Sequence, residues 1–238
     1  MSLIDAAIDY VYSLFRDNAG GHDAAHTLRV YQNAMLIAQQ EPDCDLEILA
    51  LSALLHDADD HKLFHTENNA NARSFLTQHD VESDKIEYIC RVINAVSFSQ
   101  NRGKRPESLE GMIVQDADRL DAIGAIGIAR TFAFGGEHGR PLEATIQHFQ
   151  DKLLLLKDEM NTETAKRIAE SRHLFMVDFY RNLMRRQNIN KKCPPNAEQS
   201  VWRANYYAMT LAMTSLSGTK GSDQKRESNE SEALSPRT

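Results

Sequence analysis

The chain has little cysteine: three in 238 residues, at positions far apart in the sequence. Cys44, Cys90 and Cys193 form no CxxC pair, so we expect neither a disulfide framework nor a zinc site built from thiolates. Cys90 follows Ile89 and precedes Val92 and Ile93, and we expect it to be a small core residue.

Long apolar runs are also missing, and the N-terminus lacks the basic-then-apolar pattern of a secretion signal. We therefore expect no membrane association and interpret the chain as a cytoplasmic protein. The net charge of −7 leaves no surplus of positive charge for binding nucleic acid. With 42% hydrophobic and 26% charged residues, the composition is that of a soluble globular protein. The sequence does not indicate an oligomeric state.

No convincing stretch alternates apolar and polar residues as a half-buried strand would. Apolar residues instead recur at helical spacing, as at Ile4, Ile8, Val11 and Phe15. The pattern predicts an all-α fold, and Pro106 suits the first turn of one of its helices. The Gly-rich residues 135–141 and the polar residues 59–66 are expected to be loops. We expect helices at about 3–16, 23–40, 46–57, 67–79, 83–97, 106–134, 142–160 and 162–187.

The last fifty residues differ in composition from the rest of the chain. Residues 1–187 are expected to form one helical domain. Residues 188–216 contain Pro194 and Pro195, typical of a linker, and a possible extra helix at 198–215. Residues 217–238 are almost free of apolar side chains, so they cannot offset the entropy cost of ordering, and we predict a disordered tail.

Two ionisable residues, His56 and Asp57, directly follow the apolar run at 49–55. Burying both beside a core helix costs free energy unless something compensates them. A divalent metal ion would do so, because it binds neutral imidazole and ionised carboxylate together.

Two other segments supply further groups of the same kind. His22 and His26 are four residues apart and share a face of a helix, although an isolated helical histidine is more often structural. Asp118 and Asp121 also share a helix face, while Asp116 is equally consistent with capping an early helical turn.

These segments occur in the order of the HD-domain metal-dependent phosphohydrolases, which the chain resembles over roughly residues 1–187. The last of the matching blocks resembles a bacterial branch of nucleotide pyrophosphohydrolases. The blocks are His22-Asp23-x-x-His26-x-x-Arg29-Val30, Leu55-His56-Asp57-x-x-Asp60-x-Lys62, Ser97-Phe98-Ser99, and residues 114–125 continuing to Arg130.

The resemblance implies a metal site formed by His26, His56, Asp57 and Asp118. It makes His22 a group beside the ligands or facing the substrate. Such a mixed nitrogen and oxygen site suits manganese best in our interpretation, with nickel, cobalt, iron, magnesium or zinc as alternatives. Asp57 could bridge the metal and the nucleophile, and Asp60 could act as the acid or base.

Four residues are candidates for contacting the substrate. Lys62 can bind a phosphate oxygen as a point charge or be an ordinary solvated lysine. Arg119 can reach phosphate or pair with nearby acids, and Asp121 can orient a ligand or a substrate hydroxyl. Lys152 is a further candidate for the phosphates. Arg130 is a candidate partner for a core acid.

We therefore expect an enzyme that acts on a small phosphate substrate, a nucleotide by resemblance. The favoured reaction is attack of metal-bound water on a nucleoside triphosphate, which gives the monophosphate and pyrophosphate. The alternatives are a phosphomonoesterase or phosphodiesterase on the same site, and a nucleotide-binding regulatory module with little turnover.

Overall fold

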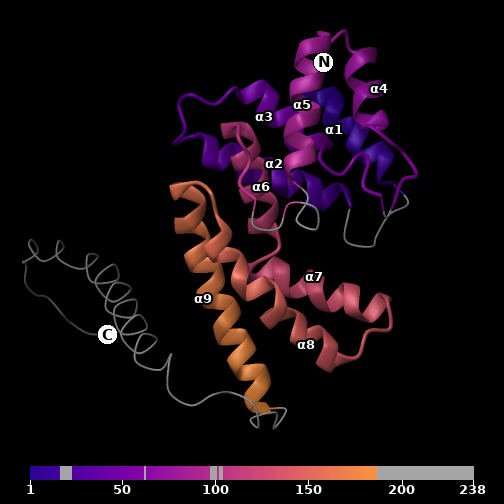
Figure 1. Cartoon of the computed structure of the whole chain (residues 1–238). Coiled ribbons are helices and arrows are strands. Elements are labelled where there is room, and N and C mark those ends of the chain that lie inside the picture. Colours follow the sequence, from indigo (N-terminus) through magenta and orange to yellow (C-terminus); the bar gives the residue numbers. More distant parts are fainter. Residues whose placement is uncertain (17–22, 62, 97–100, 102–103, 187–238) are drawn as a thin grey trace, which may run out of the picture. The chain divides into compact units, whose positions relative to one another are not determined.

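The computed structural model of the chain describes residues 1–16, 23–61, 63–96, 101 and 104–186. Every regular element in these residues is a helix, and they contain no strand, which confirms the all-α fold. They lie in the first of two units, Met1–Gln187. The linker, the extra helix and the disordered tail expected after residue 187 fall outside the described residues. In chain order the elements are α1 (Leu3–Leu14), α2 (Ala24–Ala38), α3 (Leu46–Leu55), α4 (Ala70–Gln78), α5 (Ser83–Val96), α6 (Leu109–Asp121), α7 (Gly124–Glu137), α8 (Leu142–Asp151), the 3-10 helix η1 (Leu153–Glu159) and α9 (Glu163–Arg186) (Figure 1).

Short polar side chains set the starts of the helices that matter most for the site. The carboxylate of Asp23 accepts a hydrogen bond from the backbone N–H of His26 at 2.6 Å and so caps α2. Asp45 caps α3, and Ser108 caps α6 through the N–H of Gly111. The helix expected to contain Pro106 therefore begins three residues later, and Pro106 lies outside it. None of the described helices is long and apolar enough to cross a membrane.

The single helix expected at 106–134 was wrong, because the chain forms two helices there. Ile123 is extended and Gly124 has a φ of +77°, a left-handed conformation that glycine adopts without strain. The apolar pattern continues through this break, so periodicity alone did not reveal it.

Other expected boundaries shift for local reasons. Asn68 and Asn69 have positive φ, so α4 begins at Ala70 rather than near residue 67. The helix expected at 142–160 changes into the 3-10 helix η1 at Leu153. The Gly-rich break is shorter than expected, since α7 continues to Glu137. The third helix ends at Leu55, so His56 is its C-cap and Asp57 follows it.

The central helix α3 is buried on all sides from Leu49 to Leu55, beyond its exposed first turn. It packs against α1, α2, α5 and α6, and α6 in turn packs against α2 and α5. A helix that is apolar all round must be surrounded in this way. The packing brings together the start of α2, the end of α3 and the second half of α6, where His26, Asp57 and Asp121 approach one another.

Candidate metal centre

The ring of His56 is held in one tautomer by its own helix. Its Nδ1 lies 2.9 Å from the carbonyl oxygen of Ala53, which can only accept, so we assign the proton to Nδ1. Its Nε2 is buried and makes no hydrogen bond within the described part of the chain. A buried nitrogen lone pair without a donor is costly, and a metal ion would satisfy it.

His26, in the first turn of α2, presents its Nε2 to the same place. The residue is 2% exposed. Its Nε2 lies 3.4 Å from Oδ2 of Asp57 and 3.5 Å from Oδ1 of Asp118. Because Nδ1 contacts another carboxylate, Asp121, it is Nε2 that faces Asp57 and Asp118.

The two carboxylates complete the cluster. Oδ2 of Asp57 lies 3.4 Å from Nε2 of both His26 and His56. One ligand atom each from His26, His56 and Asp118 lie within 4.8 Å of one another. Atoms that bind one transition-metal ion at about 2.0–2.2 Å are themselves about 3–4 Å apart, and the distances of 3.4, 3.5 and 3.4 Å from the imidazole nitrogens to the two carboxylates lie in this range. The two nitrogen and two oxygen donors match ions of the manganese-to-zinc series.

The turn that carries Asp57 is anchored to α4. The carboxylate of Asp59 accepts hydrogen bonds from the backbone N–H groups of Asn71 and Ala72 at 2.9 and 3.0 Å. The side-chain amide of Asn71 donates to the carbonyl of Ala58 at 2.8 Å. Asp59 thus caps α4 from a distance and fixes the backbone beside Asp57, which the sequence pattern did not indicate.

Asp121 contacts the cluster through the Nδ1 side of His26. Its Oδ2 lies 2.7 Å from Nδ1 of His26 and 2.5 Å from Nη1 of Arg130. Its Oδ1 accepts from Nε of Arg29 at 2.7 Å. Asp121 thus contacts His26, as a residue that orients a ligand would, and Arg130 pairs with this buried acid.

Burial and hydrogen bonding act in opposite directions on this pair. Burial raises the pKa of Asp121, but hydrogen bonds from His26 and Arg29 and nearby positive charges hold it well below its usual range. Burial lowers the pKa of His26, but the hydrogen bonds to Asp121 and Asp57, with the charges of Asp57 and Asp118, raise it to about 9. Without metal, the site therefore favours protonated His26.

Close packing of α7 on the end of α6 places Arg130. A Cβ atom on Gly127 would lie 2.2 Å from the carbonyl oxygen of Ala122, so only glycine allows this approach. Arg130 lies one helical turn further along α7, within reach of Asp121.

The remaining sequence candidates have different positions in the structure. Asp60 lies on the Asp57 turn, with its backbone N–H bonded to the carbonyl of Asp57 at 3.1 Å. Lys152 lies at the end of α8, where its charge acts on His148. His22 and Lys62 fall outside the described residues.

Arg119 contacts η1 through Glu159. It is 4% exposed and donates from Nη1 to the backbone carbonyl of Glu159. Its Nη2 also lies 3.4 Å from the Glu159 carboxylate. These contacts match the alternative in which Arg119 pairs with a nearby acid. They also connect α6 to η1.

Asp116 does not cap its own helix. It is fully buried in the second half of α6 and accepts hydrogen bonds from the backbone N–H groups of Asn161 and Thr162, each at 2.8 Å. Asp116 therefore supports the start of α9. Capping an early turn of its own helix was the wrong alternative for this residue.

Comparison with known proteins places this arrangement in a family. Residues 23–123 match the family model of the HD domain. The chain is 43% identical to the Bacillus subtilis protein YpgQ over 183 residues, which cover 73% of this chain and 88% of YpgQ. The crystal structure of YpgQ in complex with ADP superimposes with a TM-score of 0.67 and 36% identity, covering 79% of this chain and 98% of that one. A crystallised HD-superfamily hydrolase from Bacillus thuringiensis gives a TM-score of 0.64 and 38% identity, with 78% and 96% covered.

Proposed function

This chain belongs to the HD domain family, and we propose that it is a metal-dependent phosphohydrolase that converts nucleoside triphosphates to monophosphates and pyrophosphate. The observation that carries the proposal is the convergence of His26, His56, Asp57 and Asp118, with Nε2 of His56 buried and without a hydrogen bond in the described residues. Burying such a cluster of polar and charged side chains costs free energy unless a cation binds to it.

A divalent ion bound there would polarise a phosphate oxygen and acidify a water molecule. The side chains of the protein prepare its place. His26 and His56 each direct Nε2 toward the cluster because Nδ1 is held by Asp121 and by the Ala53 carbonyl, respectively. Asp57 lies between the two imidazoles.

We assign proton transfer to Asp60, on the same turn as Asp57. The hydrogen bond between the Asp60 N–H and the Asp57 carbonyl keeps the two residues in a fixed relation. A half-buried carboxylate beside the reacting phosphate could accept a proton from the attacking water.

The nucleotide class is supported by the relative YpgQ, which was crystallised with ADP. We propose that Lys62 holds the outer phosphates and that His22 faces the substrate, and Lys152 is a further candidate for phosphate contact. Arg119 and Asp121 are left out of the substrate site, because their side chains are engaged with Glu159 and with His26 and Arg29.

Product analysis tests the proposal. The full chain would be incubated with several nucleoside triphosphates and, in turn, manganese, nickel, cobalt, iron, magnesium or zinc, and the products separated by chromatography. We expect monophosphate and pyrophosphate in equal amounts. Orthophosphate release would instead show a phosphatase, and no turnover with any metal would favour a binding module. Asp118→Asn, prepared in parallel, controls for contaminating hydrolases.

Lys62→Ala tests the phosphate contact. Removing a charge-assisted hydrogen bond costs roughly 1.5–3 kcal/mol, so kcat/KM for triphosphates should fall about tenfold to a hundredfold. For p-nitrophenyl phosphate, which has no outer phosphates, the loss should be much smaller. Equal losses would place Lys62 at the reacting phosphate, and no loss would make it an ordinary solvated lysine. Lys152→Ala, compared on the same two substrates, tests the second candidate for this contact.

A further inference from the structure

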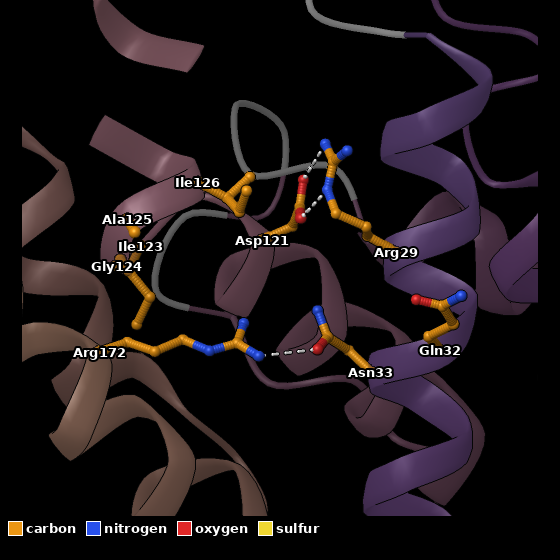
Figure 2. A pocket seen from close by; sticks show the side chains of 9 residues that line it. All are labelled: Arg29, Gln32, Asn33, Asp121, Ile123, Gly124, Ala125, Ile126 and Arg172. Carbon is orange, nitrogen blue, oxygen red and sulfur yellow. Dashed lines mark hydrogen bonds and ion pairs between the residues drawn. The ribbon is translucent and has the colours of Figure 1, made fainter. Parts of the chain in front are cut away.

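A pocket of about 400 Å³ lies beside Asp121, between α2, the junction of α6 and α7, and α9 (Figure 2). Asp121 and Arg29 line it, but none of the four candidate metal ligands does. Figure 2 shows Arg172 reaching from α9 toward Asn33 on the opposite wall. The pocket therefore adjoins the metal cluster through Asp121, which contacts His26, but it is not lined by the candidate ligands themselves.

Arg172 is a half-buried cation whose hydrogen-bond partners are neutral. Its Nη1 donates to the backbone carbonyl of Leu120 at 2.7 Å, and its Nη2 donates to Oδ1 of Asn33 at 3.0 Å. The described residues place no carboxylate in ion-pair contact with it, although the charge of Asp121 acts on it from further away. A guanidinium has five N–H donors, so donors remain after these two bonds. Withdrawing a cation from water without an anion costs free energy, and an anionic ligand would offset that cost.

The charges around the pocket also favour an anion. Of the residues that line the pocket, Arg29 and Arg172 are cations and Asp121 is an anion, which leaves one excess positive charge in a chain of net charge −7. The N-terminus of α7 begins at the pocket residue Gly124 without a side-chain cap and adds the positive end of a helix dipole. This contribution supplements the guanidinium groups.

The remaining lining suits a ligand larger than a bare anion. Ile126 is 47% exposed and provides an apolar wall, and the exposed Gln32 provides an amide on the opposite helix. A volume of about 400 Å³ lies within the usual range for small-molecule sites, roughly 300–1,000 Å³.

We propose that this pocket is a second ligand site, which binds a phosphate group between Arg172 and Arg29. The group belongs to inorganic phosphate or pyrophosphate, or to a mononucleotide. The site goes beyond the proposed hydrolysis and does not depend on it.

Calorimetric titration of the full chain, stripped of metal by a chelator and kept in phosphate-free buffer, tests this site. The titrants are orthophosphate, pyrophosphate and adenosine monophosphate. Gln32→Glu adds a negative charge to the exposed pocket wall at constant size, and Gln40→Glu makes the same change at an exposed glutamine that does not line the pocket. Arg172→Met removes the cation, and its thermal unfolding is measured as a check on folding.

We expect saturable binding of at least one titrant to the unmodified chain. Gln32→Glu should weaken binding roughly fivefold or more, and Arg172→Met roughly tenfold or more. Gln40→Glu should bind as the unmodified chain does. Tighter binding of the nucleotide than of the inorganic ions would identify a nucleotide site, and the reverse a site for free phosphate. No saturable binding, or equal affinity in all variants, would overturn the proposal. Because no metal or turnover is involved, this result is independent of the hydrolysis assay.

Discussion

Nδ1 of His26 lies 2.7 Å from Oδ2 of Asp121, although the two residues are 95 positions apart in the chain. The carboxylate can only accept, so it fixes the proton on Nδ1 and leaves Nε2 to face Asp57 and Asp118. Two guanidinium groups, from Arg29 and Arg130, hold the carboxylate in place. The arrangement of the candidate metal centre therefore depends on a contact between helices as well as on the candidate ligands.

Replacing the orienting carboxylate should weaken metal binding. In Asp121→Asn the amide retains the shape but loses the charge, so we expect the affinity for Mn²⁺ to fall about 10- to 100-fold. The free ion can be measured by electron paramagnetic resonance during titration. Asp43→Asn makes the same change at an exposed position and should leave the affinity unchanged. An affinity for Asp121→Asn within twofold of the unmodified value would remove Asp121 from this role.

Metal binding should strengthen as the pH rises toward 9. The pKa of His26 in the metal-free protein is raised to about 9, so at lower pH the metal must displace a proton from it. Each unit of pH below 9 should therefore reduce the apparent affinity up to about tenfold. Titrations with Mn²⁺ between about pH 6 and 8 measure this slope, and a flat profile would contradict the raised pKa.

The stability of the metal-free protein should change over a related pH range. Because the folded-state pKa of His26 is raised from 6.5 to about 9, its contribution is fully present below about pH 6.5 and is lost as the pH rises through 9. The pKa of Asp121 is lowered, so its contribution is present above its unfolded pKa and is lost as the pH falls through its folded value. Chemical unfolding with a chelator present should show stability falling from pH 6.5 to 9, less so in Asp121→Asn.

Substitution of a candidate ligand should abolish hydrolysis with little loss of folding. The side chain of Asp118 is 28% exposed, so Asp118→Asn should remain folded while activity falls by more than about a hundredfold. His56→Ala and Asp57→Ala should behave similarly. Activity is measured by pyrophosphate release, and folding by circular dichroism. Near-normal activity in any of the three variants would contradict the metal-hydrolase proposal.

Two glycines of α7 should respond oppositely to substitution by alanine. In Gly127→Ala the new Cβ would lie 2.2 Å from the Ala122 carbonyl oxygen, and the helices must separate. We expect a loss of about 1–3 kcal/mol of unfolding free energy and weaker metal binding, because Arg130 moves with the helix. Nothing lies within 4 Å of a Cβ on Gly136, so Gly136→Ala should leave stability unchanged or raise it by up to about 1 kcal/mol. Similar effects at both positions in denaturant unfolding would show that the close approach is not needed.

Arg119 should matter for stability rather than for substrate. Arg119→Met removes the buried guanidinium that joins α6 to Glu159, and we expect a loss of about 3 kcal/mol of unfolding free energy. KM for a triphosphate, measured below the unfolding temperature, should stay within about twofold of normal. A large rise in KM with unchanged stability would instead indicate that Arg119 binds the substrate.

The sequence by itself determined the fold class and the chemical types at the site. Helical spacing of apolar residues is a local property, so it predicted the all-α fold and the approximate position of most helices. A histidine and an aspartate directly after seven buried residues indicated a compensating ion.

The tertiary structure decided which polar groups meet. Asp116 caps the start of α9 by accepting hydrogen bonds from the backbone N–H groups of Asn161 and Thr162, which are far away in the sequence. Asp59 caps α4 by accepting a hydrogen bond from the backbone N–H of Asn71. The apolar pattern continues across the break at Gly124, so only the structure showed the break and the close approach of Gly127 to Ala122. The half-burial of the Arg172 charge could not be predicted from the sequence either, because it results from the contacts of α9 with α2 and the end of α6. Local spacing specifies a helix face, whereas partners on different helices are set by the packing of the whole core.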